Sequence, residues 1–229
     1  MRPVVIVMVK APRAGFAKTR LVPPLSELDA ASLAVSFVQD VVKAAQRIVP
    51  KLIVAYAPHN GRALLEAFLP KDLLWLEQQG EDLGERLEAA VWHAASLGFS
   101  PLIVIGADSP TLPDSFIETA RDALAAGKID AVLGPTADGG YYLVGLRQPI
   151  AHLFQNIAWS TPFTYKQTAR NISGHGLHLL ELPQWYDVDT FSDLLRQRDE
   201  LFSDEAARQR APATYRWLLA HDLSGLPPA

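Results

Sequence analysis

Short apolar runs alternate with amphipathic segments along the chain, and this alternation restricts the possible fold more than any other feature. A run rich in β-branched residues is typical of a buried strand, and the segments between the runs carry helical periodicity. Strands that alternate with helices predict a three-layer α/β/α fold around a mainly parallel, Rossmann-like sheet. The predicted strands are residues 4–9, 52–57, 73–76, 101–105, 131–134, 141–146 and 177–182.

The bulk composition narrows the class of protein. The 229 residues are 49% hydrophobic, and no linker of Gly, Ser and Pro divides them, so we expect a single domain over residues 1–229. A net charge of −4 argues against a nucleic-acid partner, and no apolar run is long enough for a membrane span. The absence of cysteine excludes disulfides, zinc–thiolate sites and cysteine nucleophiles. The cytoplasm is the expected location.

A basic segment directly follows the first predicted strand. It contains Lys10, Arg13, Lys18 and Arg20 without any acid, and Gly15 lets the backbone approach a ligand closely. Backbone N–H groups and cations at the end of a strand can share the charge of a phosphate. We therefore predict a phosphate-binding loop; the alternative is a solvated loop whose cations serve solubility.

A carboxylate follows another predicted strand. Asp108 lies three residues beyond the end of the strand predicted over residues 101–105. At this place it suits Mg²⁺ or Mn²⁺, since these ions take one or two protein carboxylates together with phosphate oxygens. The alternative is that Asp108 accepts hydrogen bonds from the amides of the next turn. The candidates for a second ligand are Asp189, Asp187 and Asp138. Asp189 precedes a predicted helix, so an N-terminal cap is an equal alternative for it.

Two further segments are candidates for substrate contacts. Asp138 precedes Gly139 and Gly140, a pattern typical of a tight turn whose amides could also meet an acceptor or a sugar. Tyr141 and Tyr142 follow on a strand, so one is expected to face a pocket and the other the core. The segment 81–86 reads as a helix start, and a role in holding a base or ribose is the alternative.

These polar segments are expected to meet. Ligands of open α/β sheets bind beyond the carboxyl ends of the strands. Residues 10–20, Asp108 and Asp138 all directly follow predicted strands, although they are far apart in the sequence. The sequence therefore predicts one site at one edge of the sheet. The tryptophans, including Trp159, are interpreted as packing residues.

The polar segments described above lie in three longer stretches, Val9–Leu21, Gly106–Pro113 and Asp138–Leu146. These stretches resemble the bacterial GT-A-type transferases called radical-SAM/selenodomain-associated transferases, whose members are commonly described as glycosyltransferases. The chain is also similar to nucleotidyltransferases that handle molybdopterin, phospholactate and sugar phosphates. The resemblance covers nearly the whole chain and implies the nucleotide-diphospho-sugar transferase fold.

The resemblance also implies roles for individual residues. Asp108 and Asp189 would bind Mg²⁺ or Mn²⁺, with Asp187 as a further candidate ligand. Phe191 stands where the relatives of this family have proline two residues after the second ligand, which weakens that match. The implied nucleotide and phosphate contacts are Lys10, Gly15, Lys18, Arg20, Asp82 and Gly84, and the implied acceptor contacts are Gly139, Gly140 and Tyr141.

Three functions are consistent with these residues. The first is glycosyl transfer from a nucleoside-diphosphate sugar to a small acceptor, with Asp108, Asp138 and Lys18 as catalytic residues. The second is nucleotidyl transfer from a nucleoside triphosphate to a phosphorylated substrate, which releases pyrophosphate. The third is a non-catalytic nucleotide-binding protein. From the residues alone the first two are nearly equal, and the resemblance favours glycosyl transfer.

Overall fold

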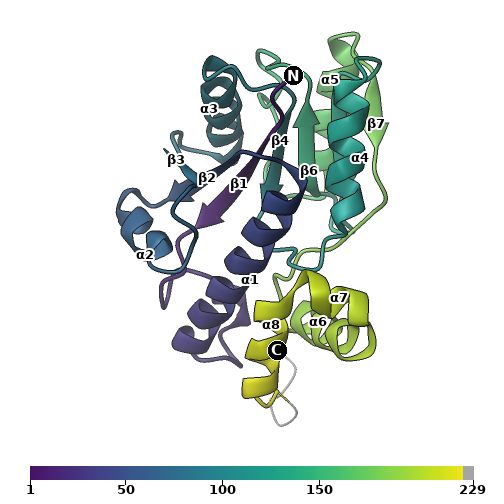
Figure 1. Cartoon of the computed structure of the whole chain (residues 1–229). Helices are drawn as coiled ribbons and strands as arrows, with labels where there is room; N and C mark the ends of the chain where they lie inside the picture. The colour runs from purple at the N-terminus through teal and green to yellow at the C-terminus, as the bar shows by residue number, and fades with distance from the viewer. Residues whose placement is uncertain (224–229) are drawn as a thin grey trace.

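The computed structural model describes residues 1–223 and contains one seven-stranded sheet (Figure 1). The strand order is β3-β2-β1-β4-β6-β5-β7. All strands run parallel except β6, which is antiparallel to both β4 and β5. The mixed α/β fold and the mainly parallel sheet are thus as predicted. The strands are β1 Val4–Lys10, β2 Leu52–Ala57, β3 Leu74–Glu77, β4 Leu102–Gly106, β5 Ala131–Pro135, β6 Tyr141–Leu146 and β7 Leu179–Glu181.

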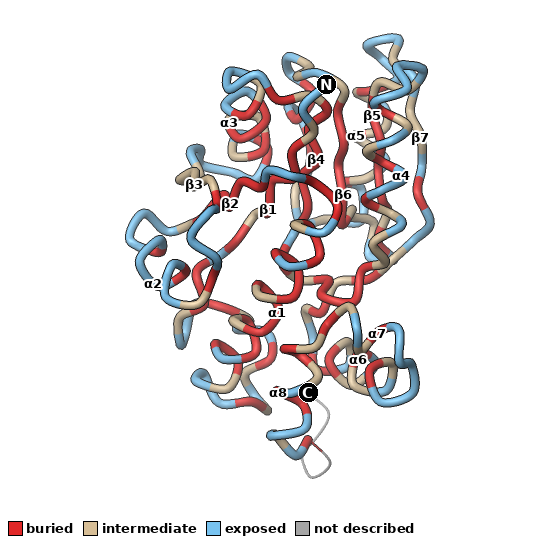
Figure 2. Tube along the Cα trace, viewed as in Figure 1, coloured by how far each residue is buried: buried red, intermediate tan, exposed pale blue. Residues whose placement is uncertain are grey.

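Helices cover both faces of the sheet. One core lies between the sheet and the helices α1 (Glu27–Ile48), α2 (Arg62–Glu66) and α4 (Asp114–Ala125). A second core lies on the opposite face, under α3 (Leu83–Ser96) and α5 (Thr164–Gly174). Figure 2 shows the strands as buried traces between these helices, in keeping with the continuous apolar runs of the sequence. The three layers that the sequence predicts are therefore present.

Local sequence signals set the helix ends. The hydroxyl of Ser26 accepts a hydrogen bond from the Asp29 amide at 3.1 Å and caps α1. The carboxylate of Asp82 does the same for the Glu85 amide at 2.9 Å, so α3 begins within residues 81–86, where the sequence predicts a helix start. Side-chain acceptors at these positions satisfy amides that have no partner within the helix.

The C-terminal helices form a third, smaller core beside the sheet. The helices α6 (Phe191–Ser203), α7 (Glu205–Arg210) and α8 (Pro212–Ala220) pack with the first half of α1. Leu21 and Leu25, which follow the basic loop, are buried in the same cluster. Because this core contains both the end of the loop and the start of α6, it fixes the two segments that approach the sheet edge from opposite ends of the chain.

Candidate functional site

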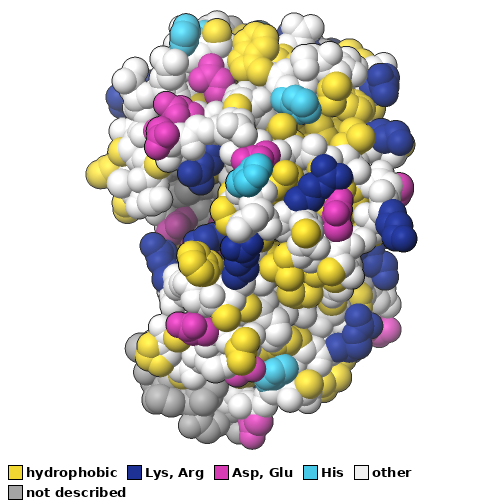
Figure 3. Space-filling model, turned by 90° about the vertical axis from the view of Figure 1, so that its left-hand side faces the viewer, with side chains coloured by type: hydrophobic (Ala, Val, Ile, Leu, Met, Phe, Trp, Pro, Cys, Tyr) yellow, Lys and Arg dark blue, Asp and Glu magenta, His cyan; other side chains and the backbone are white. Residues whose placement is uncertain are grey.

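A cavity of about 560 Å³ lies at the edge where the parallel strands end. Figure 3 views the molecule from the left-hand side of Figure 1, and Lys and Arg side chains gather there around a hollow. Segments that are far apart in the sequence meet at the cavity, as the strand directions require. The predicted site residues that line it are Lys10, Lys18, Arg20, Asp108, Asp138, Gly140, Tyr141, Asp187 and Asp189.

At one end of the cavity, the charged side chains are arranged around the ammonium group of Lys18. Its Nζ lies 2.5 Å from Oδ1 of Asp108 and 3.6 Å from Oδ1 of Asp189, and it donates a hydrogen bond of 2.6 Å to the carbonyl of Val188. The Lys18 side chain is only 6% exposed, whereas those of Asp108 and Asp189 are 49% and 47% exposed. A buried ammonium group therefore joins the two acids that were expected to bind a metal ion.

Backbone geometry holds Lys18 in this place. Its φ of 51° puts it in the left-handed region, directly before a 3₁₀ turn over Thr19–Leu21. The Nζ also lies 5.3 Å from the centre of the Phe37 ring, a distance at which the ring attracts a cation. A left-handed conformation is costly for a residue with a side chain, so its presence beside a cluster of charges is typical of a functional loop.

The other loop cations divide between the cavity and a neighbouring turn. Arg20 is exposed, lines the cavity and places its Nη1 3.8 Å from Oδ2 of Asp189. Arg13 instead turns away to Asn60, donating a hydrogen bond of 2.6 Å to its side-chain oxygen. Three of the four loop cations, Lys10 included, therefore face the cavity.

The acids at this end are held by burial and by their neighbours. Thr190, and not Asp189, caps α6 by accepting a hydrogen bond from the Asp193 amide, which leaves the Asp189 carboxylate free to face Lys18. Burial raises the pKa of Asp189 above its usual value, and the ammonium of Lys18 opposes that shift. Burial raises the pKa of Asp187 to about 7, although a hydrogen bond from Ser109 favours the charged form.

The donor set can be compared with what a divalent cation needs. Among residues 1–223, no group of three or more His, Cys, Asp or Glu side chains is arranged to hold a metal ion. The carboxylates of Asp108 and Asp189 are hard oxygen donors that share one cation partner. Magnesium is commonly bound by one or two carboxylates with the remaining positions filled by phosphate and water. The pair therefore fits an ion that arrives with a phosphorylated ligand better than an ion held by protein groups alone.

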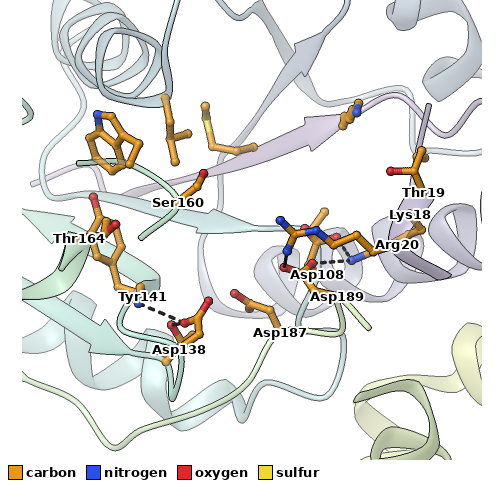
Figure 4. Close-up of a pocket in the computed structure, with 18 of the residues that line it drawn as sticks. Lys18, Thr19, Arg20, Asp108, Asp138, Tyr141, Ser160, Thr164, Asp187 and Asp189 are labelled. Atoms are coloured by element: carbon orange, nitrogen blue, oxygen red, sulfur yellow. Dashed lines mark hydrogen bonds and ion pairs between the residues drawn. The ribbon is translucent and has the colours of Figure 1, made fainter. Parts of the chain in front are cut away.

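The far end of the cavity has a different chemistry. Figure 4 shows Tyr141, Ser160 and Thr164 at one end, Lys18 and the two acids at the other, and Asp138 and Asp187 between them. Asp138 forms the predicted tight turn, because its Oδ1 accepts hydrogen bonds from the Gly140 amide at 3.1 Å and from the Thr136 hydroxyl. Both bonds go to Oδ1, so Oδ2 is the oxygen through which Asp138 can reach a ligand.

The two neighbouring tyrosines separate as the strand alternation predicts. Tyr141 lines the cavity, while Tyr142 is 3% exposed in the core and donates a hydrogen bond of 2.8 Å to the Pro183 carbonyl. Burial raises the pKa of both hydroxyls above the usual value, so neither is ionised at neutral pH. Tyr141 therefore contributes a neutral aromatic wall.

Sequence reasoning missed the loop that completes this end. Trp159, interpreted as a packing residue, lines the cavity with its ring 6.4 Å from that of Tyr141 in an edge-to-face arrangement. The neighbouring residues Ser160, Thr161 and Thr164 line it as well. The loop follows β6, whose carboxyl end lies at the opposite edge, so the rule that located the other segments does not reach it. The sequence feature that could have indicated this loop is the run of Ser, Thr and Pro directly after Trp159.

Four predicted contacts do not line the cavity. The carboxylate of Asp82 caps α3, and a side chain on Gly84 would approach Trp159 Nε1 at 2.7 Å, so these two residues support the helix start and the aromatic wall, while Leu83 between them lines the cavity. Gly15 has a φ of +76° at an exposed turn. Gly139 packs directly against Pro162, where any side chain would collide with backbone. Each of the four thus has a local structural reason, and their roles in binding stay predictions.

Residues 40–161 match the family of uncharacterized proteins conserved in bacteria known as DUF2064. The chain belongs to this family. A crystal structure from Desulfovibrio desulfuricans G20, described as a candidate nucleotide-diphospho-sugar transferase, is 32% identical to this DUF2064 protein, with a TM-score of 0.88 over 96% of this chain and 95% of the other. No curated protein is similar enough to count as a match.

More distant structures share the fold alone. A synthetase for CMP-2-keto-3-deoxy-manno-octonic acid, solved with CTP, is 12% identical, with a TM-score of 0.60 over 88% of this chain and 99% of the other. A cytidylyltransferase of Leptospira borgpetersenii is 13% identical, with a TM-score of 0.53 over 94% of this chain and 97% of the other. Within residues 1–223, no helix combines the length and apolar character that crossing a membrane requires.

Proposed function

We propose that this DUF2064 protein is a metal-dependent transferase that moves a sugar from a nucleoside-diphosphate sugar to a small acceptor. The observation that carries the proposal is the cavity with two unlike ends, one built from cations and acids and the other from aromatic and hydroxyl groups, with Asp138 between them. The likeness to the Desulfovibrio protein supports a nucleotide-linked transferase. The resemblance to radical-SAM/selenodomain-associated transferases agrees with this assignment.

The charged end is proposed to bind the diphosphate. Lys10, Lys18 and Arg20 are the cations that face the cavity, and they would counter the charge that grows on the leaving diphosphate as the glycosidic bond breaks. Asp108 and Asp189 would hold Mg²⁺ or Mn²⁺, which when bound supplies further positive charge beside the same oxygens. Lys18, released from the two acids, is then placed to donate hydrogen bonds to phosphate.

Asp138 is proposed to act on the acceptor. Its Oδ2 would take the proton from an acceptor hydroxyl while the hydroxyl oxygen forms a bond to the anomeric carbon of the sugar. The bond from that carbon to the diphosphate oxygen breaks, and the nucleoside diphosphate leaves with the electron pair. The turn that fixes Oδ1 through Thr136 and Gly140 keeps the carboxylate oriented for this step.

Nucleotidyl transfer is the second candidate, and the fold shared with the CTP-bound synthetase and the cytidylyltransferase favours it. In that reaction a substrate phosphate attacks the α-phosphate of a nucleoside triphosphate. The position of Arg13 argues against nucleotidyl transfer. A nucleoside triphosphate has a third phosphate to be bound, but the Arg13 side chain is hydrogen-bonded to Asn60 and does not face the cavity. Glycosyl transfer needs two phosphates to be bound, which the three remaining cations can do.

Product analysis separates the two reactions. The protein is incubated with Mn²⁺ and a panel of nucleoside-diphosphate sugars, and released nucleoside diphosphate is measured. A parallel incubation with nucleoside triphosphates and sugar phosphates is assayed for pyrophosphate. The proposal expects nucleoside diphosphate to be released and the D108A variant to release none above background. Pyrophosphate without nucleoside diphosphate would replace the first function by the second.

A further inference from the structure

The cations of the cavity all come from one segment. Lys10, Lys18 and Arg20 belong to residues 10–20, and none of the described residues that line the far end is Lys, Arg or His. The side chains at the far end are those of Tyr141, Trp159, Ser160, Thr161 and Thr164, and Asp138 borders this end on the side of the charged end. The only formal charge among them is negative. The acceptor end is thus built without any group that would neutralise a phosphate or a carboxylate.

This distribution of charge bears on the acceptor. A second phosphate at the far end would lie close to the carboxylate of Asp138 with no opposite charge beside it, and like charges at such range repel strongly outside bulk water. A neutral hydroxyl, in contrast, can donate to Asp138 and lose its proton there. The far end therefore discriminates against negatively charged acceptors in two ways: it has no cation to neutralise them, and the Asp138 carboxylate repels them.

The shape of the far end indicates what it accepts. Trp159 and Tyr141 present an apolar wall at an edge-to-face spacing of 6.4 Å, and Ser160 adds an exposed hydroxyl beside it. Pockets that pair aromatic surface with a few polar groups suit ligands that have apolar faces and hydroxyl edges. Sugar rings and polyols have this character.

The loop that carries these groups is held in a costly conformation. His152, Asn156 and Ser160 have φ values of 62°, 56° and 59°, which are left-handed conformations of residues other than glycine. Gly84 and Gly139 allow neighbouring backbone to pack directly against Trp159 and Pro162 of the same loop. Conformations of this kind persist where the surroundings impose them, and they cluster at ligand-binding sites.

We infer that the acceptor is an uncharged, hydroxyl-bearing molecule such as a sugar ring or polyol, bound between the Trp159–Tyr141 wall and the carboxylate of Asp138. This inference rests on the proposed function, because it assigns the charged end to the donor. The oxygen that attacks the donor sugar is then a hydroxyl oxygen, its proton passes to Asp138, and the diphosphate is the leaving group.

The test uses matched pairs of probes that differ only in a phosphate: glycerol against glycerol 3-phosphate, and glucose against glucose 6-phosphate. Their binding is measured by saturation-transfer NMR on the full-length protein, saturated with whichever of UDP, GDP, ADP or CDP raises its melting temperature most. The neutral member of each pair is expected to bind at least fivefold better. Equal binding, no binding by either member, or preference for the phosphorylated member overturns the inference.

Two variants sharpen the result. S160K adds a cation at an exposed position that lines the cavity and already has a left-handed backbone, and it is expected to reverse the preference within each pair. F163K adds the same charge three residues along the loop, at a side chain that is 60% exposed and does not line the cavity, and it should keep the preference of the parent. Unchanged preference in S160K counts against the inference.

The outcome is separable from failure of the proposed function. If no nucleotide raises the melting temperature and the neutral probes still bind preferentially without nucleotide, the donor assignment fails and the acceptor site stands. If a nucleotide binds but the phosphorylated probes are preferred, the acceptor inference fails, and nucleotidyl transfer becomes the better account of the nucleotide site.

Discussion

The two ends of the cavity are built in different ways. The charged end is made of groups that already satisfy one another: the Lys18 ammonium contacts Asp108 and Asp189 and bonds the Val188 carbonyl. The far end is a wall of neutral groups with one carboxylate, and the turn around Asp138 engages only one of its oxygens. A ligand at the charged end must replace existing interactions, whereas a ligand at the far end only adds new ones.

This difference indicates which end depends on charge. Binding at the charged end should vary with salt, metal and pH, because each changes the balance among Lys18, Arg20 and three acids. Binding at the far end should depend on contact with Trp159 and on shape. The following predictions test that division, from the largest expected effect to the smallest.

Asp108→Asn is expected to have the largest effect. The substitution keeps the shape of the side chain but removes the charge that Lys18 contacts at 2.5 Å and that a metal ion requires. Loss of one electrostatic contact in a transition state lowers turnover by about 10²- to 10³-fold. Initial rates of nucleoside diphosphate release measure the effect, and circular dichroism checks that the fold is kept.

Asp114→Asn is the matched control for that experiment, since Asp114 pairs with Arg47 at 2.9 Å at the N-terminus of α4 and does not line the cavity. It should leave turnover within about twofold of the parent, because surface ion pairs contribute little. Near-normal turnover in D108N would remove Asp108 from the mechanism.

Lys18→Met is expected to act on nucleotide and metal in opposite directions. The loss of a charge-assisted hydrogen bond to phosphate, about 1.5–3 kcal/mol, raises the nucleotide Kd about tenfold or more, and high salt reduces the difference. Binding of Mn²⁺ without nucleotide should become tighter, because the ammonium no longer occupies the space between Asp108 and Asp189. Calorimetry measures both.

Lys43→Met on the exposed face of α1 controls for the general loss of a positive charge. It should change neither affinity measurably. Weaker Mn²⁺ binding in K18M would contradict the idea that Lys18 and a metal ion compete for the same two carboxylates.

The direction of the strands explains why the sequence predicted the charged end of the cavity better than the far end. Asp108 and residues 10–20 directly follow strands that run parallel, so their meeting could be predicted without coordinates. The strand β6 runs the other way, and the chain must return over residues 147–158 before it reaches the cavity, so Trp159 and Ser160 were not found. The path of a loop depends on packing against distant segments such as Gly84, which no local pattern encodes.

For other residues the sequence allowed more than one role, and contacts with neighbouring residues in the fold determine which role is adopted. Either a cap or a ligand was consistent with Asp189, and Thr190 takes the cap because its hydroxyl and the Asp193 carboxylate satisfy each other's amides. Arg13 was one of four equivalent loop cations, and its bonds to Asn60 depend on a turn 47 residues away. Sequence thus located the charged groups, while tertiary contacts decided which of them face the ligand.

Trp159→Ala tests the far end by itself. Loss of the aromatic wall should raise the acceptor KM about tenfold, equivalent to roughly 1.4 kcal/mol, while the Kd of the nucleotide stays within twofold. Steady-state kinetics at fixed donor concentration gives the first value, and calorimetry gives the second. The exposed Trp92 on α3 offers the control W92A, for which both values should be unchanged. A large loss of nucleotide affinity in W159A would break the division between the ends.

The smallest effect is expected from Asp187, the acid of the charged end that lies toward Asp138. Its pKa is raised by burial to about 7 in the folded protein, against 3.8 for the ordinary carboxyl, so the folded state binds the extra proton between these values. In that range this carboxyl ionises in the unfolded chain but not in the folded protein, so the free energy of unfolding falls as pH rises from about 4 to 7, with no further change above. The side chain of the D187N variant cannot ionise, so the stability of this variant relative to the parent should increase over that range.

Urea unfolding at pH 4.5, 6 and 7.5 measures the trend, and S160A at the neutral end should show the same pH dependence as the parent. A constant difference between D187N and the parent would mean that the charged end carries no electrostatic cost before a ligand arrives, and the contrast between the two ends would then rest on shape alone.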